Sequence, residues 1–276
     1  MPSSAFIAVG TVELTLIVVG CVLLWQHALS PAARSALRPA SLPPWDIRLE
    51  EFLTFTLLVL GGSFFLAIVA APLARSSGLA GDAVTIVTGA AAQLGMLGGV
   101  LLSAVVRRAH NSEKGHGFAT VFWSGAATFA IALPVLVVTA KLSEFLVRAA
   151  GLPVDKQDLI GMFARADTPW LLAMLIGLAV LVAPLTEELV FRAGVFRYLR
   201  TRIPRALALV LPALFFAALH VNWKTLSGLA SLPPLLVLAV IFSLAYERTG
   251  RIGTPIVAHA LFNLNTVLVV LSGIDR

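Results

Sequence analysis

The sequence predicts an all-α fold, a polytopic membrane helix bundle of about eight transmembrane helices around a central polar cavity. Hydrophobic residues make up 59% of the chain and charged residues only 12%, whereas soluble domains carry about 25% charged residues. Apolar runs of about 20 residues recur along the whole length, as helices need to cross the hydrocarbon core of a bilayer. Polar side chains inside these runs point to a cavity, because positions that face lipid exclude them.

The expected spans follow the apolar runs in order. The first run has no basic residue before it, which favours an uncleaved anchor with its N-terminus outside over a cleaved signal peptide. The fifth run is expected to continue as helix beyond its acidic residues, to Arg200. The runs cover residues 5–25, 52–74, 83–106, 118–140, 169–190, 206–222, 229–246 and 252–272.

Basic residues indicate the orientation. With the N-terminus outside, the inner loops hold 13 of the 20 Lys and Arg residues, and an excess of positive charge marks the cytoplasmic side. The net charge of +6 therefore indicates orientation and not nucleic-acid binding. The single cysteine excludes an intrachain disulfide and any multi-cysteine metal site. The inner loops are 27–50, 107–117, 192–205 and 247–251.

Three parts are expected along the chain. Residues 1–50 would form an N-terminal transmembrane anchor and a proline-rich linker, so the first span is expected at the periphery of the bundle. Residues 51–168 would hold helices 2–4 and a long amphipathic loop, in which 141–168 is a partly helical surface element. Residues 169–276 contain every signal for chemistry and would form the functional transmembrane core.

Two adjacent acids and an arginine lie at the end of the fifth apolar run. A charged side chain near the bilayer centre costs about 2.5–3.5 kcal/mol, so such groups are paired, line a wet cavity or do chemistry. Glu188 and Arg192 are four residues apart and can pair on one helix face, whereas Glu187 points about 100° away. Glu187 is thus a candidate general base for water. The simpler alternative is an ordinary salt bridge at a helix end near the headgroups.

Two further polar pairs lie in later apolar runs. Phe216 and His220 are four residues apart, so the ring can buttress the imidazole, although a lone His in an apolar helix is often a hydrogen-bonded structural group. His259 and Asn263 share this spacing and can donate two hydrogen bonds to an oxyanion, although Asn263 can also bridge helices. Three polar pairs on three of the last four apolar segments, with a spare acid, are difficult to explain by packing alone.

These pairs form three motifs, EExxxR at 187–192, FxxxH at 216–220 and HxxxN at 259–263. In this order they resemble the CAAX protease and bacteriocin-processing (CPBP) family of intramembrane proteases, whose best-known members are the type II CAAX prenyl endopeptidases. The resemblance covers about residues 169–268. One position departs from the family, since many members have Gly directly after the Arg, whereas Ala193 stands there in this chain.

The resemblance implies a membrane-embedded endopeptidase with two possible mechanisms. In one, Glu187 activates water with the help of His220, and His259 with Asn263 stabilises the tetrahedral oxyanion. In the other, a zinc ion is held by Glu187, His220 and His259, a His₂Glu set of catalytic type. Asn263 is a poor zinc ligand and a good amide donor, which favours the metal-free mechanism, but the same residues serve both.

Supporting roles and partners also follow from the resemblance. Glu188 and Arg192 would hold the site together, and Phe216 would support it. The implied partners are a peptide or lipidated protein substrate and membrane lipids, with no nucleic acid, and the site would open to the cytoplasmic side. In a bacterial protein, peptide maturation or bacteriocin immunity is more plausible than prenylated substrates.

A non-catalytic function is the alternative to a protease. Buried charges also serve gating, assembly and proton relays in transporters and membrane scaffolds. Glu13 and Gln93, in the first and third spans, offer weak support for such a role. Interhelical hydrogen bonding is the simpler explanation for both residues.

Overall fold

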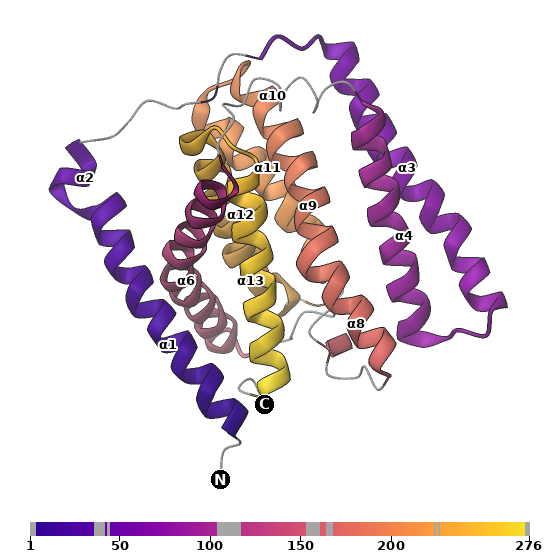
Figure 1. Cartoon of the computed structure of the whole chain (residues 1–276), viewed down its shortest axis with the longest axis horizontal. Helices are drawn as coiled ribbons and strands as arrows, with labels where there is room; N and C mark the ends of the chain where they lie inside the picture. The colour runs from indigo at the N-terminus through magenta and orange to yellow at the C-terminus, as the bar shows by residue number, and fades with distance from the viewer. Residues whose placement is uncertain are drawn as a thin grey trace.

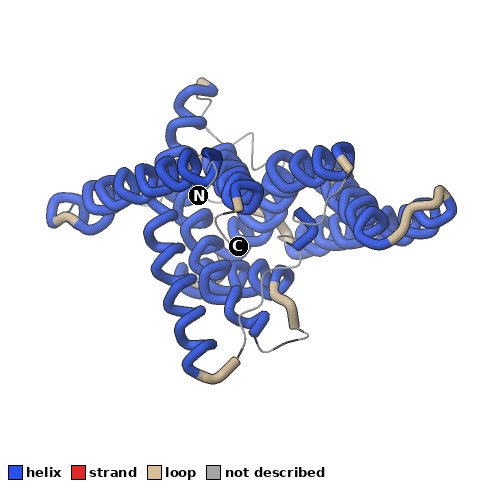
Figure 2. The backbone as a smooth tube through the Cα atoms, turned by 90° about the horizontal axis from the view of Figure 1, so that it is seen from below, coloured by secondary structure: helices blue, strands red, loops and turns tan. Residues whose placement is uncertain are grey.

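The computed structural model describes residues 4–35, 42, 45–103, 117–152, 161–163, 168–223, 225 and 227–273. These residues form helices joined by turns and short loops, and none of them lies in a strand (Figure 2). The protein is therefore an all-α, polytopic helix bundle, as its composition predicts.

Within the described ranges, seven helices are long and apolar enough to cross a membrane. The sixth predicted span corresponds to α11, which has 16 residues and is a shorter apolar helix. The count of about eight thus holds for apolar helices, while seven of them reach full spanning length. The helices outside the fifth span are α1 (Ser4–Leu24), η1 (Trp25–Leu29), α2 (Pro31–Ser35), α3 (Leu49–Ser76), α4 (Gly81–Leu102), α6 (Phe118–Ala149), α11 (Arg205–His220), η4 (Ser227–Ser231), α12 (Leu232–Thr249) and α13 (Gly253–Ser272).

The fifth span is one continuous helix from Pro169 to Arg200, which confirms its predicted extension past the acids. Two π-helical segments interrupt its α-helical geometry, and Pro184 follows the first of them. Proline has no N–H to donate to the preceding turn, which accounts for a local change of register there. The segments in order are α8 (Pro169–Gly177), η2 (Leu178–Val182), α9 (Ala183–Glu188), η3 (Leu189–Phe196) and α10 (Arg197–Arg200).

The fourth span, α6, corrects one prediction. It runs without a break over 32 residues to Ala149, so residues 141–149 are its last turns and not a separate surface element. The helix ends just before Gly151, whose φ of +73° lies in the left-handed region that glycine adopts without strain. The remainder of the predicted loop element, at 153–160 and 164–167, lies outside the described residues.

Small residues bring the peripheral helices close to the bundle. Helix α1 lies at one edge beside α6 (Figure 1), and a Cβ added to its Gly20 would lie 2.9 Å from Cδ of Pro134. Apart from Gly20, no described residue of α1 is buried, which confirms the peripheral position predicted for the first span. Glycine at such contacts is typical of helices that associate in lipid.

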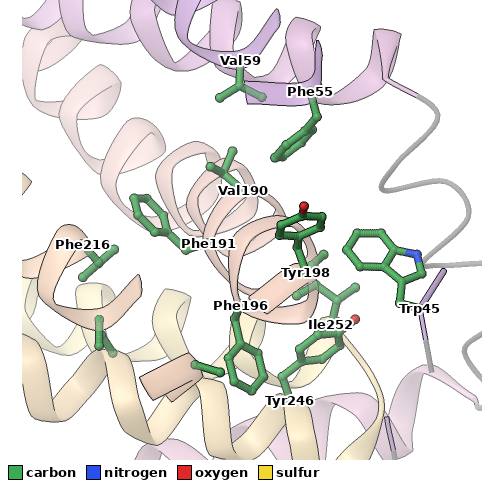
Figure 3. Close-up of a cluster of buried hydrophobic side chains, with 14 of the residues drawn as sticks. Trp45, Phe55, Val59, Val190, Phe191, Phe196, Tyr198, Phe216, Tyr246 and Ile252 are labelled. Carbon is green, nitrogen blue, oxygen red and sulfur yellow. The ribbon is translucent and has the colours of Figure 1, made fainter. Parts of the chain in front are cut away.

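The largest hydrophobic cluster among the described residues surrounds the second half of the fifth span, residues 190–198. It joins side chains of η3, α10, α11 and α12 to Phe55 and Val59 of α3 (Figure 3). The linker also contributes to it, because Trp45 and Ile47 are buried and the guanidinium of Arg197 lies 5.2 Å from the Trp45 ring. The linker was expected only to separate the first span from the rest, and its end instead packs into the core.

Gly194 provides a test of this packing. A Cβ at this position would lie 2.6 Å from Cε1 and Cζ of the Phe55 ring, so Gly194→Ala is expected to destabilise the protein by about 1–3 kcal/mol through overpacking. Thermal unfolding in detergent measures the effect. Gly61→Ala on α3 is the control, since nothing lies within 4 Å of its added Cβ. Equal unfolding midpoints for both variants would contradict this account of the α3 contact.

Candidate active site

Two helices joined by a short turn bring the first acid and the first histidine to a similar distance from that turn. The fifth span and α11 are joined by the short segment 201–204. Glu187 lies 13 residues before Arg200, and His220 lies 15 residues after Arg205. At about 1.5 Å per residue, both side chains are roughly 20 Å from the connecting turn.

Glu187 lies between two imidazoles drawn from different helices. Its Oε2 is 3.7 Å from Nε2 of His220 on α11 and 4.0 Å from Nε2 of His259 on α13. Glu187 and His259 are only 7% and 4% exposed. The three residues that sequence analysis grouped as the reacting set therefore converge, at separations that one water molecule can bridge.

Glu188 links two other members of the predicted set. Its Oε1 accepts hydrogen bonds from Nη1 of Arg192 at 2.8 Å and from Nδ1 of His259 at 2.9 Å. The pairing with Arg192 confirms the prediction from spacing, whereas the bond to His259 was not predicted. Glu188 and Arg192 are 0% and 1% exposed, so their pair is enclosed by the bundle and is not an exposed salt bridge. The Nη2 group of Arg192 also donates to the carbonyl of Ala239 on α12.

Two phenylalanines support the charged groups. The Phe216 ring lies 4.4 Å from the His220 ring, as the spacing predicts, and 4.9 Å from the Arg192 guanidinium. Phe242 on α12, which sequence analysis did not single out, lies 5.3 Å from the His259 ring. It also lies 5.5 Å from the Arg192 guanidinium. Both rings thus lie beside the same arginine and beside His259, and Phe216 also packs on His220, so these contacts orient the charged groups.

Asn263 shares a helix with His259 but is engaged elsewhere. Its Nδ2 donates to the carbonyl of Ala179 at 2.7 Å, in the π-helical segment η2. This bond fits the alternative that Asn263 bridges helices. An amide nitrogen has two N–H donors, so the second one is available to another acceptor.

The region that holds these side chains is similar to a known protein family. Residues 168–265 match the Rce1-like family. The matching model is described as type II CAAX prenyl endopeptidase Rce1-like, and it spans all three motifs, which confirms the family resemblance for this region. No curated protein and no solved structure matches the chain. Together with the seven apolar helices, the match supports an integral, multi-pass membrane protein with a protease region.

The hydrogen bonds fix the tautomers of both histidines in the Rce1-like region. His220 donates from Nδ1 to the carbonyl of Phe216 at 2.7 Å, and His259 donates from Nδ1 to the Glu188 carboxylate. Carbonyl and carboxylate oxygens only accept, so Nδ1 carries the proton in each ring. In a neutral ring, Nε2 therefore presents a lone pair towards Glu187, and it donates only when the ring is protonated.

The same side chains bear on the zinc alternative. Among the described residues, no group of three or more His, Cys, Asp or Glu side chains is placed to hold a metal ion. The set of Glu187, His220 and His259 named from sequence thus does not form such a group.

One contact reaches the Rce1-like region from outside its bounds. Gln93 on α4 donates from Nε2 to Oε1 of Glu187 at 3.1 Å. Sequence analysis noted Gln93 only as a polar residue in an apolar run and gave interhelical hydrogen bonding as its simpler explanation, which this bond confirms. Glu13 likewise accepts an interhelical hydrogen bond from Asn265 at 2.7 Å.

Proposed function

We propose that this protein is an intramembrane endopeptidase that hydrolyses a peptide bond near the membrane surface with water activated by Glu187. The observation that carries the proposal is the convergence of Glu187, His220 and His259 from three helices at 3.7 and 4.0 Å. The Glu187 carboxylate and Nε2 of a neutral His220 ring can accept hydrogen bonds from the two O–H groups of one water, and Nε2 of His259 faces the same carboxylate oxygen. Such a water presents its own lone pair to a substrate carbonyl.

The chemistry begins with proton transfer from this water to Glu187. The oxygen of the water adds to the peptide carbonyl carbon, and the carbonyl oxygen becomes the oxyanion of a tetrahedral intermediate. Glu187 then returns the proton to the peptide nitrogen as the C–N bond breaks. His220, held by the Phe216 carbonyl, assists by accepting a hydrogen bond from the second O–H group of the water.

Stabilisation of the oxyanion is assigned to His259 and Asn263. Because Nδ1 of His259 is bonded to Glu188, Nε2 can donate to the oxyanion only from the imidazolium form. The Glu188 carboxylate, which also pairs with Arg192, is the counter-ion of that imidazolium. The free N–H of Asn263 is the second donor, while its other N–H holds the carbonyl of Ala179.

The substrate class and the side of access belong to the same proposal. The description of the matched family names CAAX prenyl endopeptidases, so we assign hydrophobic or lipidated peptides as substrates. Arginines gather at the α10–α11 turn, which the positive-inside rule places in the cytoplasm, and we assign access to that side. Residues 169–276 form the catalytic core, with 1–50 as anchor and linker and 51–168 as the flanking helices.

The proposal is tested by cleavage of a lipidated fluorogenic peptide by the full-length protein in liposomes. Turnover is expected for the intact protein and is expected to be lost in Glu187→Gln. A protein that binds such peptides without cleaving them, or that turns over equally well without the Glu187 carboxylate, does not use the proposed chemistry.

A chelator titration separates the two versions of the mechanism. We expect the full rate of peptide cleavage to survive exhaustive metal removal, because Glu187 and His220 can activate the water without a metal ion. The bound metal is quantified by mass spectrometry beside the rate. Loss of activity on chelation, with recovery when zinc is restored, would instead support the His₂Glu site.

A further inference from the structure

One amide connects α4 to the active-site helix at two consecutive residues. The Nε2 group of Gln93 donates to Oε1 of Glu187, and Oε1 of Gln93 accepts from the hydroxyl of Thr186. Gln93 and Thr186 are both partly or fully buried, and Thr186 has no exposed surface. Gln93 lies outside the region that matches the protease family, so the match itself assigns it no role.

The chemistry of Glu187 fixes the orientation of this amide. An ionised carboxylate only accepts hydrogen bonds, so the NH₂ side of Gln93 must face Glu187. A flipped amide would bring its oxygen against the Glu187 carboxylate, an unfavourable contact of two acceptors. The Thr186 hydroxyl meets the other side of the amide as a donor. One arrangement of the three groups therefore satisfies all of them.

The hydrogen bond from Gln93 gives the two carboxylate oxygens of Glu187 different surroundings. Oε1 is held by Gln93, which leaves Oε2 as the oxygen that faces Nε2 of His220 and Nε2 of His259. Without this bond the carboxylate can rotate, because the terminal torsion of Glu is broad. Rotation would move Oε2 away from both imidazoles.

The backbone that carries Gln93 is itself tightly held. A Cβ on Gly95 would lie 2.9 Å from the backbone nitrogen of Ser63 on α3, and one on Gly99 would lie 2.6 Å from that of Val59. These glycines therefore allow α4 to pack directly against the α3 backbone. Helix α3 in turn contacts the active-site helix through Phe55 and Gly194.

We propose that Gln93 is a positioning residue for the reaction, which holds the Glu187 carboxylate so that one oxygen faces the two histidines, and that Thr186 orients Gln93. This inference rests on the proposed function of Glu187. It extends the functional unit from residues 169–276 to α4.

The test compares isosteric variants of Gln93 in the liposome assay. Gln93→Met removes both hydrogen bonds at similar size and is expected to lower kcat by about 10- to 100-fold with little change in KM. Gln93→Glu replaces the N–H donor by a second carboxylate facing Glu187 and is expected to lower kcat further. Thr88→Val on α4 is the control, because the Thr88 hydroxyl has no hydrogen-bond partner in the described part of the chain.

Two substitutions of Thr186 test whether its hydroxyl orients Gln93. Thr186→Val is expected to lower kcat because the amide loses its orienting donor, and Thr186→Ser is expected to restore kcat because the hydroxyl returns. A residue with a merely structural role would shift the unfolding midpoint without this split between Val and Ser in kcat.

The outcomes separate this inference from the proposed function. A wild-type kcat for Gln93→Met, beside an inactive Glu187→Gln, overturns the positioning role and leaves the protease intact. If the intact protein cleaves no peptide, the proposed function fails, and a thermal double-variant cycle of Gln93→Met with Glu187→Leu tests the contact alone. In that cycle, non-additive midpoint shifts support the bond to Glu187 and additive shifts overturn it.

Discussion

Replacing Glu187 by Gln is expected to lower kcat for peptide cleavage by about 10²–10⁴-fold, the usual contribution of a positioned general base. Glutamine has the same shape and still accepts the hydrogen bond from Gln93, but its amide cannot take a proton from water. The packing around the site is retained, so the unfolding midpoint of the variant should stay close to that of the parent. The measurements are peptide turnover in liposomes and thermal unfolding in detergent.

Glu13→Gln is the matched control for this variant. Glu13 is another carboxylate within an apolar helix, and it accepts a hydrogen bond from Asn265 on α13. The same chemical change, made away from the two imidazoles, should leave turnover unchanged. If Glu187→Gln and Glu13→Gln retain equal activity, Glu187 is not the base and the water must be activated by another group.

Replacing Arg192 by Met is expected to destabilise the protein by about 3–5 kcal/mol, because it leaves one partner of a buried ion pair without compensation. The pair of Arg192 with Glu188 is fully enclosed, with side chains 2% and 0% exposed. Met keeps much of the apolar contact with the Phe216 and Phe242 rings, so the loss is mainly electrostatic. Activity should fall together with the unfolding midpoint, since Glu188 also holds His259.

The chain offers a matched pair at the surface. Arg148 and Glu144 have the same i,i+4 spacing in α6, but the Arg148 side chain is 67% exposed. Exposed pairs gain little from their attraction because water screens it, so Arg148→Met should barely move the unfolding midpoint. A similar midpoint for Arg148→Met and Arg192→Met would show that burial does not decide the stability contributed by this motif.

The fold class could be predicted because a bilayer imposes simple rules on the sequence. Every full-length span was visible as an apolar run of the length that hydrocarbon requires. The ion pair of Glu188 with Arg192 was also predictable, since four residues on a helix bring side chains to one face. It persists even though the following residues, Leu189–Phe196, are π-helical. The four-residue spacing therefore predicted this ion pair correctly although the helix is irregular at this point.

Contacts between distant helices could not be predicted in the same way. Glu188 and His259 are 71 positions apart, and spacing along one helix says nothing about such a bond. Phe242 is one of many phenylalanines in an apolar chain, and only the packing of α12 distinguishes it. Gln93 carried a weak signal, as a polar side chain in an apolar run, but no pattern connected it to Glu187. The prediction that the fourth span ends at residue 140 was wrong, because a charged residue such as Lys141 does not by itself end a helix.

The cluster around η3 bears on where this protein could be divided. The segment that matches the protease family begins at residue 168, yet its buried aromatic face is closed by Trp45 from the linker and Phe55 from α3. A shortened chain that starts at the match would leave that face bare and prone to self-association. The matched region is therefore not expected to fold on its own, because the amino-terminal part of the same polypeptide covers its aromatic face.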